Sequence, residues 1–138
     1  MAQGLERFVE AQRSVYDQAL AELNAGAKRS HWMWFVFPQI AGLGHGPTAR
    51  LYAIADSVEA SAYLMHELLG RRLRECTDAM LGWAGRKSAE AILGPIDAVK
   101  FVSAMTLFDA VADGDDRFAR ALAAFNRGDR DPLPRDRL

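Results

Sequence analysis

The sequence has a single cysteine and no long hydrophobic run, and both absences exclude classes of protein. One cysteine cannot form a disulfide within the chain. The longest unbroken apolar run extends from Trp32 to Phe37, far short of the roughly 20 residues that a membrane-spanning helix needs. The N-terminal segment carries charged residues such as Glu6 and Arg7 in place of the apolar stretch of a signal peptide. These absences predict a cytoplasmic protein without a membrane span.

The sequence also lacks an excess of charge of either sign. Its 17 lysines and arginines face 18 aspartates and glutamates, for a formal net charge of -1. Such a balance gives no long-range field that would attract a polyanion, so we expect no nucleic-acid partner. The length of 138 residues suits one domain with one core. We predict a helical domain over residues 1–128 and an extended or mobile tail over residues 129–138, which has two prolines and little to bury.

The few potential metal ligands have the wrong spacing for a metal site. His31, His45, His66 and Cys76 form neither a helical pair of histidines nor a Cys-x-x-Cys motif. We therefore expect no metal and no cofactor. Cys76 falls on the apolar face of an expected helix, where a thiol behaves as a small hydrophobic side chain. Glycines 42, 44 and 46 resemble a phosphate-binding loop only superficially, because no strand precedes them and no Lys-Ser/Thr pair follows.

Apolar residues recur at intervals of three and four along most of the chain, whereas the alternation typical of strands is missing. This pattern predicts an all-α fold, a single compact domain of about six helices including short ones. The main expected helices cover residues 5–23, 57–65, 68–81, 88–94, 95–112 and 118–125, and a further short turn could begin at Gly46. Ser57 and Ser88 are the expected N-terminal caps, and Pro95 suits a first helical turn.

The densest motif runs from Lys28 to Gln39. Between His31 and Phe37 it holds two of the three tryptophans, two phenylalanines and a histidine within seven residues. Tryptophan N–H groups and histidine nitrogens need partners when buried, so the motif indicates either a polar network or a ligand. The apolar run from Trp32 to Phe37 could be a strand or a helical turn, and Ser30 as a cap favours the helix.

The helix expected from Pro95 is apolar around most of its circumference. The exception is a narrow strip formed by Asp97, Lys100 and Ser103. Lys100 could point into solvent, pair with Asp97 or face an anionic ligand, and the first two are the more ordinary roles of a lysine. For His31, similarly, a hydrogen-bonded place in the core is a more common role than catalysis.

These two segments together resemble the small bacterial domain of unknown function numbered 1810. The resemblance is carried by the residues from Lys28 to Gly44 and by Lys100 ahead of the run from Ser103 to Phe108. It implies a mainly helical single domain and supplies no activity, substrate or catalytic residue. Ala104 stands where a second serine is common in that family, so a role for a hydroxyl would fall on Ser103 or Thr106.

Two functions of different classes follow from these observations. In the first, a cleft binds or processes an anionic, nucleotide-like small molecule, by hydrolysis or glycosyl transfer if there is a reaction. The ligand-binding residues would be Lys28, Trp34, Gln39, Lys100, Ser103 and Thr106, with His31 as the catalytic acid or base. In the second, the same aromatic residues form a core or a partner-binding patch of a non-enzymatic interaction or structural module. Neither enzymatic activity nor an oligomeric state follows from the sequence.

Overall fold

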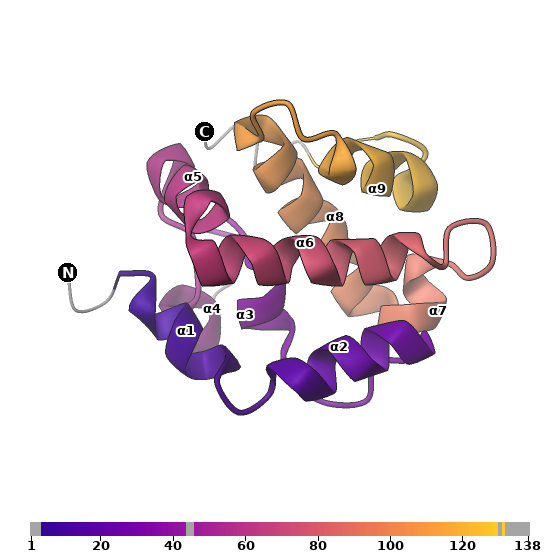
Figure 1. Cartoon of the computed structure of the whole chain (residues 1–138), viewed down its shortest axis with the longest axis horizontal. Coiled ribbons are helices and arrows are strands. Elements are labelled where there is room, and N and C mark those ends of the chain that lie inside the picture. The colour runs from indigo at the N-terminus through magenta and orange to yellow at the C-terminus, as the bar shows by residue number, and fades with distance from the viewer. Residues whose placement is uncertain (1–3, 44–45, 130, 132–138) are drawn as a thin grey trace.

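A computed structural model describes residues 4–43, 46–129 and 131, and within them the fold is helical (Figure 1). The described helices are α1 (Glu6–Gln12), α2 (Tyr16–Ala25), α3 (Met33–Val36), α4 (Pro47–Leu51), α5 (Ser57–Met65), α6 (Glu67–Leu81), α7 (Ala89–Leu93), α8 (Pro95–Val111) and α9 (Arg117–Asn126). The all-α prediction is confirmed. Nine helices are described where about six were expected, and six of these nine have seven or more residues.

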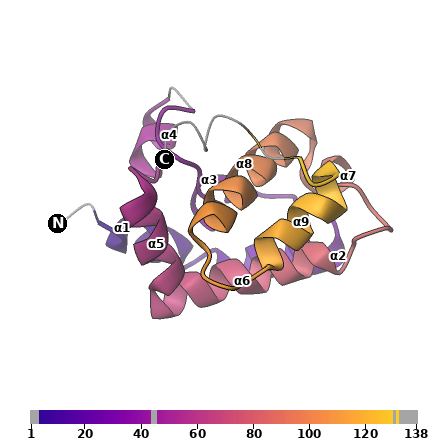
Figure 2. The ribbon, with the colours of Figure 1, turned by 90° about the horizontal axis from the view of Figure 1, so that it is seen from above.

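The long helices α6 and α8 organise the packing. Helix α6 crosses the centre of Figure 1 and packs against α2, α5 and α9. Helix α8 packs against α5, α7 and α9, and Figure 2 shows α8 and α9 side by side above α6. The core between them is rich in aromatic side chains. Those that are almost fully buried are Phe8, Trp32, Phe37, Tyr63, Phe101, Phe108 and Phe118.

The single helix expected over residues 5–23 is wrong, because the chain turns between α1 and α2. At Val15 the backbone adopts φ -123° and ψ -11°, which lies outside the helical region. After the turn, α2 packs on α6, whereas α1 packs on both α3 and α6. Gln12 at the end of α1 is buried and donates to Phe35 O (2.7 Å) and Tyr63 Oη (3.1 Å). The apolar periodicity continues across this turn, so periodicity alone did not reveal it.

The run from Trp32 to Phe37 is helical only in its middle, at α3. Trp32, Met33, Val36 and Phe37 are buried as expected, whereas Trp34 and Phe35 are partly exposed. Ser30 does not cap this helix, because its hydroxyl donates to Glu22 Oε2 at 2.7 Å. The residue at the N-cap is Trp32, which makes no capping hydrogen bond with its side chain.

The other predicted helix ends agree with the structure to within about a residue. The cap of α5 is Asp56, one residue before Ser57, and its carboxylate accepts from Glu59 N at 2.9 Å. Ser88 caps α7 as expected, with its hydroxyl accepting from Ala91 N at 3.0 Å. Gly70 lies within α6, where a Cβ atom would come within 2.1 Å of the Leu64 carbonyl oxygen. Gly70 therefore marks a close approach of α5 and α6 and not a break in the helix.

One short backbone bridge positions the segment that follows α3. Ile40 and Ile54 form an isolated parallel bridge. Ala41 N donates to Ile54 O (2.7 Å), and Ile54 N donates to Gln39 O (2.8 Å). The bridge joins this segment to the link between α4 and α5, and it holds the backbone of Gln39 in place.

Some sequence predictions concern residues outside the described part. Gly44 and His45 of the glycine-rich segment are among them, and so is the predicted tail except for Asp129 and Asp131. In the described residues, no helix has both the length and the apolar character required to cross a membrane.

Candidate functional site

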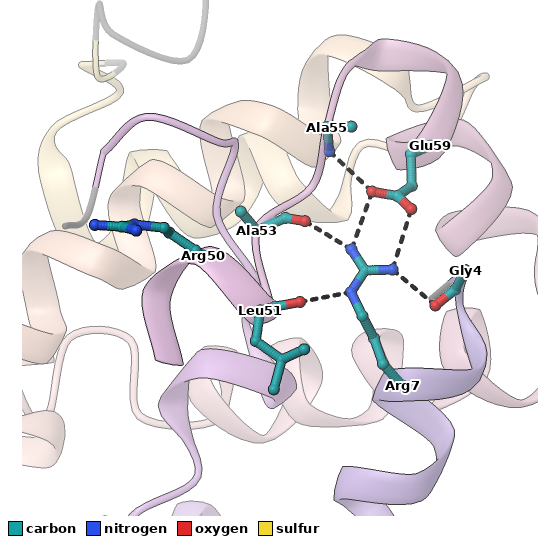
Figure 3. A pocket seen from close by; sticks show the side chains of 7 residues that line it. All are labelled: Gly4, Arg7, Arg50, Leu51, Ala53, Ala55 and Glu59. Carbon is teal, nitrogen blue, oxygen red and sulfur yellow. Dashed lines mark hydrogen bonds and ion pairs between the residues drawn. The ribbon is translucent and has the colours of Figure 1, made fainter. Parts of the chain in front are cut away.

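A cavity around Arg7 is termed the Arg7 cavity. The guanidinium group of Arg7 is already hydrogen-bonded to other groups of the protein (Figure 3). The guanidinium of Arg7 donates to three backbone carbonyls, those of Gly4, Leu51 and Ala53, each at 2.7 Å. It also donates to both carboxylate oxygens of Glu59 at 3.2 Å. These bonds use all five guanidinium N–H groups. Arg7 therefore holds the link between α4 and α5 to α1, and an anionic ligand would have to displace one of its partners.

A second cavity has a volume of about 380 Å³ and collects residues from distant parts of the chain. Its lining comes from α3, from the segment after α3, from the first turns of α8 and from Asp131. The lining residues are Trp34, Gln39, Leu43, Ile96, Val99, Lys100 and Asp131. We term it the Trp34 cavity. It brings together three of the residues that the sequence analysis selected as ligand-binding, namely Trp34, Gln39 and Lys100.

The side-chain polar groups of Trp34 and Gln39 differ from those around them in the described part of the chain. Among the described residues, the indole N–H of Trp34 and the side-chain amide of Gln39 have no hydrogen-bond partner. By contrast, Trp32 Nε1–H donates to the Glu22 carboxylate and Trp83 Nε1–H donates to a backbone carbonyl, both at 2.9 Å. Trp34, which lines a cavity, thus differs from the other two tryptophans in having an N–H without a partner among the described residues.

Lys100 belongs to a group of three charges next to the Trp34 cavity. Asp97 binds Lys28 Nζ through Oδ2 at 2.9 Å and Lys100 Nζ through Oδ1 at 3.4 Å. The three side chains expose between 11% and 21% of their surface, so solvent screens their charges only in part. We term these residues the Asp97 cluster, which has two positive charges and one negative charge. Lys100 Nζ also lies 3.9 Å from the centre of the Trp34 ring, a cation–π distance.

The backbone that leads into α3 is fixed by Glu22, a residue that the sequence analysis missed. Glu22 is 4% exposed, and its carboxylate accepts from Arg29 N (2.8 Å), Ser30 N (3.1 Å) and Ser30 Oγ (2.7 Å). Trp32 Nε1 (2.9 Å) and Gln18 Nε2 (2.7 Å) are further donors. Much of the polar character of the motif from Lys28 to Gln39 therefore serves a structural network.

This network shifts the acidity of Glu22. Burial by itself would raise the pKa of the carboxyl group. The hydrogen bonds from Arg29 N–H, Gln18, Trp32 and Ser30 outweigh burial and lower the pKa to about 2. Only the position of Glu22 in the sequence could have indicated that it is buried. It lies on the same face of α2 as Ala19 and Leu23, both of which are buried.

The remaining predicted residues do not line the Trp34 cavity. His31 is exposed. Lys28 lies outside the lining and forms an ion pair with Asp97, which also binds Lys100. Ser103 is completely buried, and its hydroxyl lacks a partner among the described residues. Thr106 is 1% exposed, donates to Val102 O at 2.8 Å and accepts from Asp131 N at 3.0 Å.

Cys76 is a core thiol, as the sequence predicts. It is buried on α6, and burial raises the pKa of its thiol to about 12. A thiol with so high a pKa is a poor nucleophile at neutral pH. Elsewhere in the described part of the chain, no group of three or more His, Cys, Asp or Glu side chains is arranged to hold a metal ion.

Comparison with known proteins identifies the family and no activity. The model of the family described as "Protein of unknown function (DUF1810)" matches residues 2–138. The chain belongs to this family. It is also similar to the crystal structure of the conserved hypothetical protein Rv1873 from Mycobacterium tuberculosis, with 48% identity and a TM-score of 0.91. That match covers 94% of this chain and 92% of the other. The search of curated proteins gave no match.

Proposed function

We propose that the protein binds an anionic, nucleotide-like small molecule in the Trp34 cavity. The observation that carries this proposal is the meeting of Trp34, Gln39 and Lys100 at one cavity, with an indole N–H and an amide that have no partner among the described residues. Ligand sites in proteins commonly combine apolar walls with a few polar groups that converge on one space.

Each part of the lining matches one part of such a ligand. The apolar walls formed by Trp34, Leu43, Ile96 and Val99 suit a flat ring. The amide of Gln39 can donate to and accept from the polar edge of a base. The ammonium of Lys100 supplies a positive charge for an oxyanion. The volume of about 380 Å³ falls within the roughly 300–1,000 Å³ that is typical of small-molecule sites.

The proposal covers binding and assigns no reaction. His31 is the group with the most suitable chemistry for acid or base catalysis at neutral pH. It is exposed and is not part of the lining of the Trp34 cavity. The geometry therefore supports a binding site better than a catalytic one.

Titration of ¹⁵N-labelled protein with AMP and with 3′,5′-cyclic AMP tests the proposal. The three tryptophans give three indole N–H signals, and a Trp34→Phe variant assigns the signal of Trp34. We expect that signal to move in a saturable way while the buried Trp32 signal stays in place. The Lys100→Met variant should lose this response, whereas Arg71→Met, which removes an exposed cation on α6, should retain it.

If neither nucleotide moves the Trp34 signal, the proposal is wrong. The alternative of a non-enzymatic interaction module would then be favoured. That alternative rests on Ile96 and Val99 at the edge of the cavity, which are 74% and 65% exposed, because exposed apolar side chains that adjoin one another are typical of partner-binding surfaces.

A further inference from the structure

We infer that Lys28 is a positioning residue for the Trp34 cavity, because it binds Asp97 and thereby leaves Lys100 available to the oxyanion of a ligand. The inference rests on the proposed function, since it concerns how the same cavity binds an anion. Lys28 does not line the cavity itself. It acts on the ligand through Asp97 and Lys100, the other two members of the Asp97 cluster.

Contacts of both its backbone and its ammonium hold Lys28 in place. Its backbone N–H donates to the carbonyl of Ile92 in α7 at 2.8 Å. Its ammonium lies 2.9 Å from Asp97 Oδ2 and 5.3 Å from the centre of the Trp32 ring. With 11% of its side chain exposed, Lys28 is the most shielded member of the cluster. These contacts suit a fixed support better than a group that turns toward a ligand.

Lys100 is held less tightly and lines the Trp34 cavity. Its ammonium lies 3.4 Å from Asp97 Oδ1, a longer contact than that of Lys28 with the other oxygen. The same ammonium lies 3.9 Å from the centre of the Trp34 ring. Because Lys28 already balances the negative charge of Asp97, the positive charge of Lys100 remains available to an anion in the cavity.

Removal of Lys28 changes the partner of Asp97. Among the described residues, Lys100 would then be the one cation that binds this carboxylate, and the two charges would cancel. Their pairing is screened only in part, because both side chains are mostly shielded from water. An oxyanion would have to compete with Asp97 for Lys100, so its affinity should fall. A neutral ligand does not compete for Lys100, and its affinity should stay the same.

AMP and adenosine test this difference, because they share a base and only AMP carries a phosphate. The Trp34 indole signal gives both dissociation constants. Lys28→Met should weaken AMP binding about tenfold and change adenosine binding by less than about twofold, an effect of the size found between members of one ion-pair network. Lys28→Arg keeps a cation beside Asp97 and should retain the AMP affinity to within about threefold.

Lys87→Met is the matched control for Lys28→Met. Lys87 also lies over a tryptophan, with Nζ 5.5 Å from the centre of the Trp83 ring, and it donates to Gly26 O at 2.8 Å. It has no acidic partner among the described residues. The control therefore removes the same charge from a similar contact without changing the partners of Asp97, and it should leave both affinities unaltered.

A double-mutant cycle with Asp97→Asn separates the positioning role from a simple effect of charge. If Lys28 acts through Asp97, Lys28→Met should weaken AMP binding by no more than about twofold in the Asp97→Asn background. A long-range attraction between Lys28 and the phosphate would give the same loss in both backgrounds. Thermal unfolding curves establish that each variant is folded. If Asp97→Asn does not fold, an unchanged AMP affinity in Lys28→Met still overturns the inference.

The outcomes distinguish this inference from the proposed function. If neither AMP nor adenosine moves the Trp34 signal of the wild-type protein, the proposed function fails and the inference fails with it. If AMP binds and Lys28→Met leaves its affinity unchanged, or weakens it equally in both backgrounds, the role of Lys28 is overturned and the binding site stands. Equal losses for AMP and adenosine would also overturn it, since they would indicate a change in the shape of the cavity.

Discussion

Among single residues, Glu22 fixes the segment that leads into α3. Its one carboxylate accepts hydrogen bonds from two backbone N–H groups and three side chains. The chemistry of their side chains singles out Trp34, Gln39 and Lys100 in the sequence, and these residues do meet at one cavity. The role of Glu22 could not be predicted, because a glutamate within an amphipathic helix is usually solvated, and only the three-dimensional packing places the donors around it.

We predict that Glu22→Gln destabilises the protein by roughly 2 to 4 kcal/mol. A glutamine has one acceptor oxygen where the carboxylate has two, and its amide N–H would face donors. The free energy of unfolding in urea measures the loss. Asp17→Asn, which removes an exposed acid in the first turn of the same helix, should cost less than about 1 kcal/mol. Equal losses for the two variants would show that the hydrogen bonds to Glu22 contribute nothing specific.

The low pKa of Glu22 predicts how stability depends on pH. The pKa is about 2 in the folded protein and 4.5 for an unperturbed glutamate. Between these values the unfolded chain binds the proton more readily, so the contribution of Glu22 is fully present above about pH 4.5 and is lost as the pH falls toward 2. Urea unfolding at several pH values should show the wild-type advantage over Glu22→Gln shrinking across this range. A constant advantage would contradict the assignment.

The neighbouring tryptophans should respond differently to truncation. Trp32 is 1% exposed and its N–H is bonded to Glu22, so Trp32→Ala should cost about 3 to 5 kcal/mol. Trp34 is partly exposed, and its N–H has no partner among the described residues. Trp34→Ala should therefore cost less than about 2 kcal/mol. Thermal or urea unfolding checks the order, and a larger loss for Trp34→Ala would mean that Trp34 serves mainly the core.

Among helices, the predictions succeeded where a local signal marks the end and failed where tertiary packing decides it. Ser88 and Gly94 mark both ends of α7, and Pro95 begins α8, as the sequence predicts. The turn between α1 and α2 has no glycine or proline. Gln12, just before the turn, is buried and donates to Phe35 O and Tyr63 Oη, and these partners are distant in the sequence. A pattern of apolar residues contains no information about such contacts.

The crossing of α5 and α6 depends on Gly70. A Cβ atom at this position would lie 2.1 Å from the carbonyl oxygen of Leu64, which belongs to the backbone of α5. We predict that Gly70→Ala costs more than about 3 kcal/mol or prevents folding, since the two helices would have to separate. Gly46→Ala is the matched control, because no atom of the described residues lies within 4 Å of its Cβ position, and it should cost less than about 1 kcal/mol. Circular dichroism during thermal unfolding measures both.

For the whole molecule, Arg7 connects the N-terminal helix to the link between α4 and α5 (Figure 3). We predict that Arg7→Lys destabilises the fold by roughly 2 to 4 kcal/mol, since a lysine keeps the charge but cannot reach three carbonyls and Glu59 together. Arg13→Lys is the control, because the Arg13 pair with Glu10 is exposed, and it should change stability by less than about 0.5 kcal/mol. Urea unfolding gives the free energy of unfolding of both variants. Similar losses for the two would refute the structural role of Arg7.

The bonds of Arg7 also bear on the order in which the chain folds. Its contacts with Leu51, Ala53 and Glu59 span 44, 46 and 52 positions along the sequence. They can form only after the intervening chain has been ordered, since such long loops must close before these contacts contribute. We therefore expect α1 to dock late in folding and to detach early in unfolding, together with the link that it holds. Substitution of Arg7 would then speed unfolding and leave the rate of folding nearly unchanged.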